Sequence, residues 1–342
     1  MNQHWKNFLL NQNAHFENEM SITFPIISAC SSGNTLYPLA HLGILKIAGN
    51  DAAKFLQGQL TCNINNITET QSSLGALCTP QGRAITTFIL AKTTDAFLMV
   101  LPKELLDTVK NRLQRYTLRA AVTLTDCSET LCLIGLVRTK PEQTKRQDNT
   151  LFSTSQQDTL SIHLSTLEDR VLIIAEVDRA IALWSDYVNN QGFLPVSSEQ
   201  WRYLDILSGL PWLTTETSEE FIPQMLNLDQ LGGISYNKGC YTGQEIVART
   251  HYLGKAKKVL CLADCISPLI PVPNSGILNS SGSNTTEAST KVLTAIRSPV
   301  STETEENSVK MLIVLQLSEH DTYNLMLNDN HQTPVTLLTR PL

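Results

Sequence analysis

The chain has 342 residues, 42% of them hydrophobic, which is enough for two or three domains that each bury a core. Its formal net charge of -6 and its pI of ≈ 5.7 argue against direct nucleic-acid binding over a large surface, which needs an excess of basic residues. No basic stretch followed by an apolar run opens the sequence, and no segment could span a bilayer. We therefore expect a cytoplasmic protein with no membrane contact.

The eight cysteines are scattered through the chain and none stands in C-x-x-C spacing. This pattern predicts neither a zinc ribbon nor a set of iron–sulfur ligands, so no stable metal site is expected. We interpret the cysteines as reduced thiols. They are Cys30, Cys62, Cys78, Cys127, Cys132, Cys240, Cys261 and Cys265.

The first 130 residues predict a mixture of helices and strands. Apolar residues at helical spacing predict a helix within residues 1–20, and a strand over 43–49 precedes a second helix that reaches Leu60. Apolar runs on both sides of Pro80-Gln81-Gly82 predict a hairpin. A strand over 95–101 and a helix that begins near Pro102 follow.

The middle of the chain continues this mixed order, which favours an α+β fold. Strands are expected at 120–125, 131–137, 160–164 and 170–176, with an exposed connection over 139–158 and a helix after Asp178. Ser197 and Gln200 form a capping box before a helix that carries Trp201. The Trp201 ring either packs in a core or stacks on a planar ligand.

The last 90 or so residues predict strands without helices, at 259–263, 291–297, 311–317 and 334–338. This run indicates a small C-terminal all-β domain, either a barrel or a sandwich. Residues 279–290 are rich in Ser, Thr and Asn, and residues 301–308 add several Glu, so both are expected to be mobile loops.

The octet Lys238-Gly239-Cys240-Tyr241-Thr242-Gly243-Gln244-Glu245 is the most informative stretch. Thr242 and Glu245 have the spacing of a capping box, which predicts a helix from Thr242 with Gly254 as its stop. Cys240 then lies just outside the positive end of the helix dipole and two residues from Lys238. Both influences favour the thiolate over the thiol.

Two other roles for Cys240 compete with a reactive thiolate. A free cysteine is often a small buried residue that packs beside a core helix. A cysteine hydrolase needs a histidine that activates the thiol, and His251 lies roughly three helical turns away by rise, beyond its reach.

The octet and the following Ile246-Val247-Ala248-Arg249 resemble the signature of the YgfZ family, folate-binding relatives of the T-protein (aminomethyltransferase) of glycine cleavage. The resemblance extends to further stretches of the chain, namely Phe55-Leu56-Gln57-Gly58-Gln59 with Thr61, Phe221-Ile222-Pro223-Gln224 and Leu231-Gly232-Gly233-Ile234-Ser235.

The resemblance implies an α+β, aminomethyltransferase-like ring of three domains around a central channel that binds tetrahydrofolate. The implied boundaries are 1–130 plus 196–250 for the folate-binding core, 131–195 for a second α+β domain, and 251–342 for a C-terminal β-barrel with a mobile loop near 275–308. Cys240 and Lys238 are the expected chemical residues. The folate site is expected to include Trp201, Leu42, Tyr241 and Arg249.

Some positions depart from the family pattern. Leu42 stands where some members have a second Trp, and Leu207 where the family often has Glu. Thr86 and Thr87 occupy the segment in which the T-protein has a catalytic Asp. A Thr hydroxyl cannot act as a carboxylate base, which argues against aminomethyl transfer.

The resemblance therefore implies a monomeric, tetrahydrofolate-binding accessory protein for maturation or repair of iron–sulfur enzymes. Its client would be an iron–sulfur protein such as a tRNA-methylthiolating enzyme, so its role in tRNA modification is indirect. The alternative is a folate-dependent aminomethyltransferase or demethylase that acts on a small amine.

Overall fold

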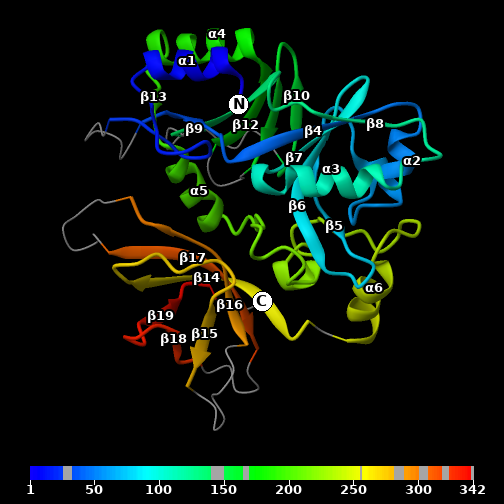
Figure 1. Ribbon diagram of the computed structural model, residues 1–342, viewed down its shortest axis with the longest axis vertical. Coiled ribbons are helices and arrows are strands. Elements are labelled where there is room, and N and C mark those ends of the chain that lie inside the picture. Colours follow the sequence, from blue (N-terminus) through cyan, green and yellow to red (C-terminus); the bar gives the residue numbers. More distant parts are fainter. Residues whose placement is uncertain are drawn as a thin grey trace. The chain divides into compact units, whose positions relative to one another are not determined.

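A computed structural model describes residues 1–25, 33–139, 150–164, 169–254, 256–280, 289–299, 307–317 and 323–339 (Figure 1). The chain divides into two compact units. Unit 1 comprises Met1–Gln57, Asn63–Leu74 and Phe88–Trp201, and unit 2 comprises Gly58–Cys62, Gly75–Thr87 and Arg202–Leu342. The three-domain boundaries and the ring expected from the sequence stay predictions.

Unit 1 contains a six-stranded sheet in the order β10-β11-β12-β9-β3-β13. Its strands pair antiparallel except β13 with β3, which are parallel. They are β3 (Thr35–Pro38), β9 (Leu131–Arg138), β10 (Thr154–Gln156), β11 (Leu160–His163), β12 (Asp169–Glu176) and β13 (Leu194–Pro195). The predicted exposed connection over 139–158 is wrong at β10, and residues 140–149 lie outside the described part.

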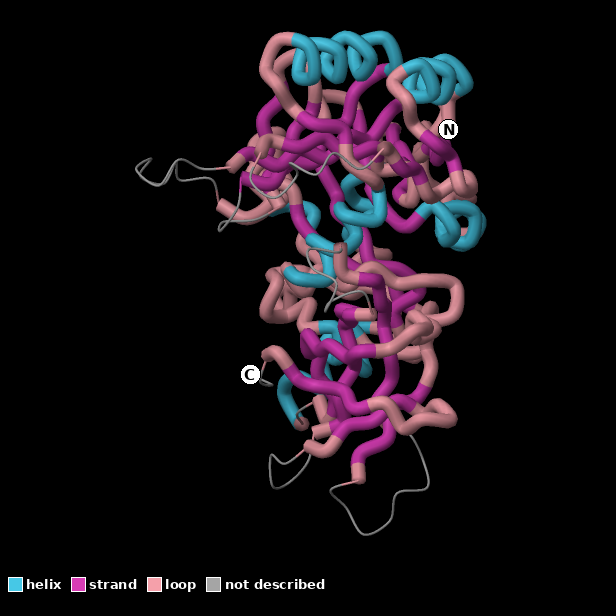
Figure 2. The backbone as a smooth tube through the Cα atoms, turned by 90° about the vertical axis from the view of Figure 1, so that its left-hand side faces the viewer, coloured by secondary structure: helices cyan, strands magenta, loops and turns pink. Residues whose placement is uncertain are grey.

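Helices α1 (Gln3–Asn11) and α4 (Val177–Asn189) lie next to each other over this sheet (Figures 1 and 2). Their buried faces meet in a core in which the Trp5 and Trp184 rings contact edge to face, 5.6 Å between centroids. The predicted helix in residues 1–20 is confirmed but ends at Asn11. Asn13 has a φ of 63°, which breaks the helix, and the chain continues as strands β1 (His15–Phe16) and β2 (Ile22–Thr23).

The second sheet has five strands in the order β5-β6-β7-β4-β8. These are β4 (Leu42–Ala48), β5 (Ser73–Cys78), β6 (Ala84–Lys92), β7 (Ala96–Pro102) and β8 (Thr123–Asp126), and the predicted hairpin of β5 and β6 is confirmed. Between the strands run helices α2 (Ala52–Gln57) and α3 (Leu106–Gln114) and the 3-10 turns η1 (Ile64–Asn66) and η2 (Lys103–Leu105).

Helix α5 (Ser198–Leu207) begins where the capping box predicts. The Ser197 Oγ accepts a hydrogen bond from the Gln200 N–H at 3.4 Å. This bond satisfies one of the N–H groups that a helix start leaves unpaired. The sequence therefore located this helix correctly.

The C-terminal part of unit 2 is a closed six-stranded barrel, ordered β14-β17-β16-β15-β18-β19. Its strands are β14 (Lys258–Ile266), β15 (Gly276–Asn279), β16 (Thr290–Arg297), β17 (Ser308–Gln316), β18 (Leu325–Leu327) and β19 (Pro334–Leu337), and its interior holds Val, Ile, Leu, Met and Cys side chains. The predicted β domain is thus confirmed as a barrel. Strands β15 and β18 were missed because three or four residues give little alternation.

The mobile loop predicted near 275–308 is wrong in part, because β15 and β16 both lie entirely within it. Barrel closure supplies the hydrogen bonds that a polar sequence alone does not predict. Residues 281–288 and 300–306 lie outside the described part. No helix among the described residues is long and apolar enough to cross a membrane.

Candidate functional site

Helix α6 (Gln244–Leu253) follows the signature octet, but it does not begin as the sequence predicts. Its N-cap is Gly243, with a φ of 85°, and no side chain caps the helix. The capping box of Thr242 and Glu245 is therefore wrong. Instead, the Gln244 Oε1 accepts a hydrogen bond from the Tyr241 N–H at 3.2 Å. Gly254 ends the helix, as expected.

The start of α6 packs directly on the turn between β5 and β6, both in unit 2 (Figure 1). A Cβ atom at Gly243 would overlap the Thr79 carbonyl oxygen, and one at Gly82 would lie 2.8 Å from the Ile246 Cβ. Both glycines also have positive φ values. Only glycine allows this backbone contact in this conformation, so the turn and the helix start fix each other.

Two polar side chains from other matched stretches hold the same region. Gln224, on the 3-10 turn η3 (Pro223–Leu226), donates from Nε2 to the Val247 carbonyl of α6 at 2.6 Å. The Thr61 Oγ1 donates to the Gly233 carbonyl at 2.7 Å and accepts from the Ala76 N–H at 2.8 Å. These side chains are a framework that assembles distant segments, which explains why the resemblance included them.

Lys238 points into unit 2 and not toward solvent. Its side chain is buried, and Nζ donates to the carbonyl oxygens of Leu60 at 2.7 Å and Cys62 at 2.8 Å. The ammonium also lies 5.0 Å from the centroid of the Tyr241 ring, a cation–π contact. Burial lowers the pKa of Lys238 to about 8, against a smaller raising effect of Cys62. The described hydrogen bonds of Nζ therefore go to these two backbone carbonyls, and the influence of Lys238 on the Cys240 thiol stays a prediction.

Cys240 is the one exposed cysteine in the described part of the chain. It lies three residues before the N-cap of α6, and the helix-dipole effect falls off within the first turn. The dipole therefore acts on the thiol less than the sequence suggested. The structure does show that the thiol is exposed to solvent. The residues on either side of it in the loop are held by hydrogen bonds of Lys238 and Tyr241.

The remaining described cysteines are buried. Burial raises the pKa of Cys78 and Cys132 to about 12, and that of Cys261 and Cys265 to about 11. Such thiols stay protonated at neutral pH and are inert. No group of three or more His, Cys, Asp or Glu side chains within the described ranges could hold a metal ion.

Tyr241 and Arg249, both predicted folate contacts, differ in exposure. Tyr241 is buried beneath the Lys238 ammonium, and burial raises the pKa of its phenol. Arg249 is exposed on α6. Arg249 can reach a ligand as it stands, whereas Tyr241 supports the loop from below.

His251 does not serve the thiol. Its imidazole stacks on the Tyr236 ring, with centroids 3.7 Å apart and an interplanar angle of 13°. The Tyr252 ring contacts it edge to face. The ring is engaged with these aromatic residues, so the structure gives no support to a Cys–His hydrolase.

Trp201 is fully buried in unit 1. The Arg170 guanidinium lies over the indole at 4.2 Å from the ring centroid, and the Tyr37 ring lies 5.4 Å away. A Cβ atom at Gly135 would overlap the indole, so the strand β9 backbone also touches it. A folate ring could stack on Trp201 only by displacing one of these groups.

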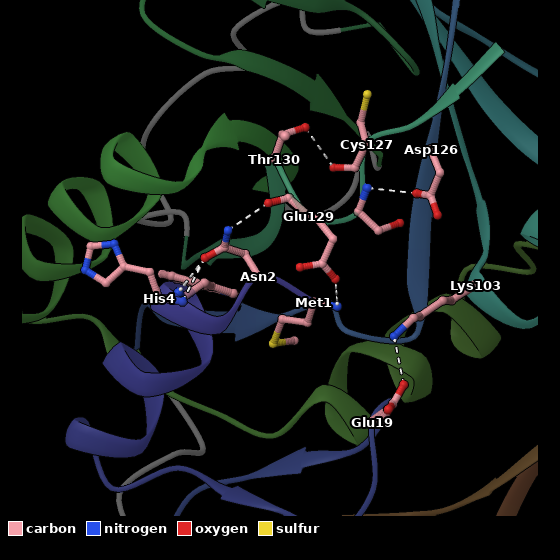
Figure 3. Close-up of polar contacts among 11 residues, drawn as sticks. Met1, Asn2, His4, Glu19, Lys103, Asp126, Cys127, Glu129 and Thr130 are labelled. Atoms are coloured by element: carbon pink, nitrogen blue, oxygen red, sulfur yellow. Dashed lines mark hydrogen bonds and ion pairs between the residues drawn. The ribbon is translucent and has the colours of Figure 1, made fainter.

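Leu42 is also buried, beside a cavity of about 30 Å³ in unit 1. Met1 and Lys103 line this cavity and form ion pairs: the Met1 ammonium with Glu129 at 2.9 Å, and Lys103 with Glu19 at 3.4 Å (Figure 3). A volume of this size holds about one or two water molecules and no pterin. A neighbouring pocket of about 380 Å³ has more acidic than basic side chains, which does not suit an anionic folate.

Thr86 and Thr87 are buried in unit 2 with their hydroxyl groups bonded to the backbone. The Thr86 Oγ1 donates to the Thr87 carbonyl at 3.0 Å, and the Thr87 Oγ1 donates to the Pro211 carbonyl at 2.5 Å. Both hydroxyls are committed to the framework, so neither substitutes for a catalytic carboxylate.

This chain is similar in sequence to known proteins. Residues 27–143 match the family model of the GCVT N-terminal domain. The tRNA-modifying protein YgfZ of Colwellia psychrerythraea is 34% identical over 235 residues, which are 66% of this chain and 71% of that protein. The YgfZ protein of Klebsiella pneumoniae is 32% identical over 232 residues, 66% of this chain and 70% of that protein.

The crystal structure of the glycine cleavage system aminomethyltransferase T from Bartonella henselae is also similar. It matches with a TM-score of 0.76 and 13% sequence identity, over 100% of this chain and 97% of that chain. This likeness confirms the predicted aminomethyltransferase-like α+β fold with its C-terminal barrel.

Proposed function

The chain belongs to the YgfZ family, and on that premise we propose that it is a tetrahydrofolate-binding accessory protein for the maturation or repair of iron–sulfur enzymes. Through such an enzyme it supports tRNA methylthiolation in the cytoplasm. The observation that carries the proposal is Cys240, an exposed thiol on a loop that the other signature residues hold in place.

The chemistry open to Cys240 follows from its isolation. One thiolate supplies one sulfur ligand, whereas an iron–sulfur cluster is normally held by four protein ligands. The other described cysteines are buried and unable to approach a shared cluster. Cys240 therefore acts with ligands from the client protein, either as a transient cluster ligand or as a thiol nucleophile.

The test of this role is a complementation experiment. Cells that lack the protein receive the native gene, Cys240→Ser, or Cys265→Ala as a control at a buried barrel cysteine. The measurement is the fraction of tRNA that carries the methylthio group. We expect Cys240→Ser to restore none of it and Cys265→Ala to restore the native level. Full restoration by Cys240→Ser would remove the proposal.

Folate binding is supported by the family and by the likeness to an aminomethyltransferase fold. Trp201 and Leu42, two residues expected to contact folate, give it less support because both are buried. Trp201 and Leu42 offer no open face, so no step is assigned to folate at these residues. Calorimetric titration with tetrahydrofolate tests the binding directly. Saturable binding by native protein that persists in Trp201→Leu, which has no ring to stack on a pterin, would confirm folate and assign its site elsewhere, whereas no saturable binding in either at two temperatures would exclude folate.

The alternative, a one-carbon transferase or demethylase, meets a specific obstacle. The segment in which the T-protein has its Asp carries Thr87, whose hydroxyl already donates to the Pro211 carbonyl. An assay of one-carbon transfer from a small amine to tetrahydrofolate separates the two functions. Sustained turnover by the native protein would favour the transferase.

A further inference from the structure

Lys238 and Thr242 tie both ends of one short loop to the same neighbouring segment. This loop, residues 238–242, is called the Cys240 loop, and the neighbouring segment is Gly58–Cys62. The Lys238 Nζ donates to the carbonyls of Leu60 and Cys62, while the Thr242 N–H donates to the Gly58 carbonyl at 3.3 Å. Cys240 is the middle residue between these two attachments.

The attachment at Lys238 is the stronger one. Hydrogen bonds from an ammonium are charge-assisted and roughly twice as strong as neutral ones, and here two of them lie within a buried site. The face of the Tyr241 ring, 5.0 Å from Nζ, supplies further stabilisation of the charge. Two of the three N–H groups of the ammonium are therefore bonded to this segment, and the side chain is buried away from the surface.

The segment Gly58–Cys62 is itself held firmly in unit 2. The Ser235 N–H donates to the Thr61 carbonyl at 2.9 Å, and Thr61 also bonds through its side chain to Gly233. The Thr61 N–H donates to the Ala76 carbonyl at 3.1 Å. Because the Cys240 loop is hydrogen-bonded to Gly58–Cys62, its motion is restricted together with that segment. Within the loop, the exposed Gly239 has no heavy atom within 4 Å of the position that a Cβ atom would take, so the anchoring comes from its neighbours.

We propose that Lys238 is a positioning residue for Cys240: its buried ammonium fixes the Cys240 loop to Gly58–Cys62 and so presents the thiol in one place. This inference rests on the proposed function only in taking Cys240 as the reactive group. It reassigns Lys238 from chemistry to placement, and it explains why a lysine stands two residues before the cysteine.

The attachment of the Lys238 Nζ to the Leu60 and Cys62 carbonyls is called the Lys238 clamp. Its response to pH depends on the titratable groups that face the ammonium. They are the Cys62 thiol and the Tyr241 phenol, and Cys78 and Tyr236 in turn act on Tyr241. Burial keeps the Tyr241 and Cys78 protons in place well above neutral pH. When Lys238 loses its proton it keeps two N–H donors, so the clamp weakens without disappearing.

The experiment measures the mobility of residue 240 itself. A nitroxide spin label is attached to Cys240 in a Cys30→Ser background, because Cys240 is the exposed cysteine among the described ones. The electron paramagnetic resonance spectrum is compared with that of Lys238→Met, which has a similar length and no donor. Hydrogen exchange of the amides in 238–242 is measured in parallel.

We expect Lys238→Met to sharpen the spectrum and to speed amide exchange in the Cys240 loop at least about tenfold, with barrel amides unchanged. Lys238→Arg, which restores charged donors, should recover part of the native spectrum. Lys258→Met is the matched control, because the Lys258 Nζ also donates to a backbone carbonyl, that of Ser289 at 2.6 Å, but belongs to the barrel. It should leave the loop unchanged.

A native spectrum and native exchange in Lys238→Met would overturn the inference. If Lys238→Met fails to accumulate as folded protein, Lys238→Gln, which keeps an uncharged donor, is measured in the same way. The proposed function is tested separately. Full complementation by Cys240→Ser would remove the proposed function even if Lys238 is confirmed as a positioning residue. If Lys238→Met leaves the loop unchanged but Cys240→Ser is inactive, the proposed function stands and only the positioning role is lost.

Discussion

Trp201 in unit 1 and Cys240 in unit 2 are two of the side chains expected to do chemistry or bind a ligand, and they differ in exposure. The indole is enclosed by Arg170, Tyr37 and the Gly135 backbone, whereas the thiol is exposed beside a buried lysine. The difference teaches that a residue expected to bind a ligand can instead be packed within the core. Burial decides which residues are available for chemistry.

The largest expected effect is at Trp201. Trp201→Ala removes a fully buried indole, and we expect the free energy of unfolding to fall by about 3–5 kcal/mol. Denaturant titration measures it. Trp201→Phe, which keeps a ring, should lose less. A loss below about 1 kcal/mol for Trp201→Ala would mean that the site is loosely packed and open to a ligand, which would break the comparison.

The next effect concerns the charge on Lys238. Its pKa is about 8 in the folded protein and 10.5 as the ordinary value, so the unfolded chain holds the proton more tightly. Below pH 8 both states are protonated and the folded protein bears the full cost of the buried charge. As pH rises from 8 to 10.5 the folded state deprotonates first, so the free energy of unfolding rises by about 3 kcal/mol.

The measurement is the unfolding free energy of native protein minus that of Lys238→Met across this pH range. The subtraction removes the titration of other groups. A difference that is flat with pH would show that the two carbonyls and the Tyr241 ring offset the cost of burying the charge.

A smaller effect is expected at the helix start. Gly243→Ala places a methyl group against the Thr79 carbonyl at a φ of 85°, and we expect a loss of about 2 kcal/mol in unfolding free energy. Gly232→Ala is the control, because its φ of 74° is similar but no heavy atom lies within 4 Å. Equal losses in both variants would mean that conformation, and not the contact with the β5–β6 turn, requires glycine.

The smallest effect on stability belongs to Cys240. Cys240→Ser changes one atom at an exposed position, so thermal or denaturant unfolding should shift by less than about 0.5 kcal/mol. A stable but inactive variant sharpens the contrast with Trp201, whose loss acts through folding. A large loss of stability in Cys240→Ser would place the thiol in the framework as well.

Much of the fold could be predicted because its patterns are local. Helix α5 and its Ser197 cap, the β5–β6 hairpin, the end of α6 at Gly254 and the long barrel strands all follow from spacing, capping and turn residues. The short strands β15 and β18 were missed, since three or four residues carry too little alternation and depend on pairing with distant strands.

For the site, the sequence by itself determined which stretch matters. The octet and its matched segments identify the family, and the octet contains Cys240. Only the tertiary structure decided what each residue does there. Lys238 and Leu60 are 178 residues apart, and backbone carbonyls leave no mark in a sequence. The residue type gives the charge of a side chain, but the packing of distant segments determines its partner. In this protein the packing buries Lys238 and leaves Cys240 exposed.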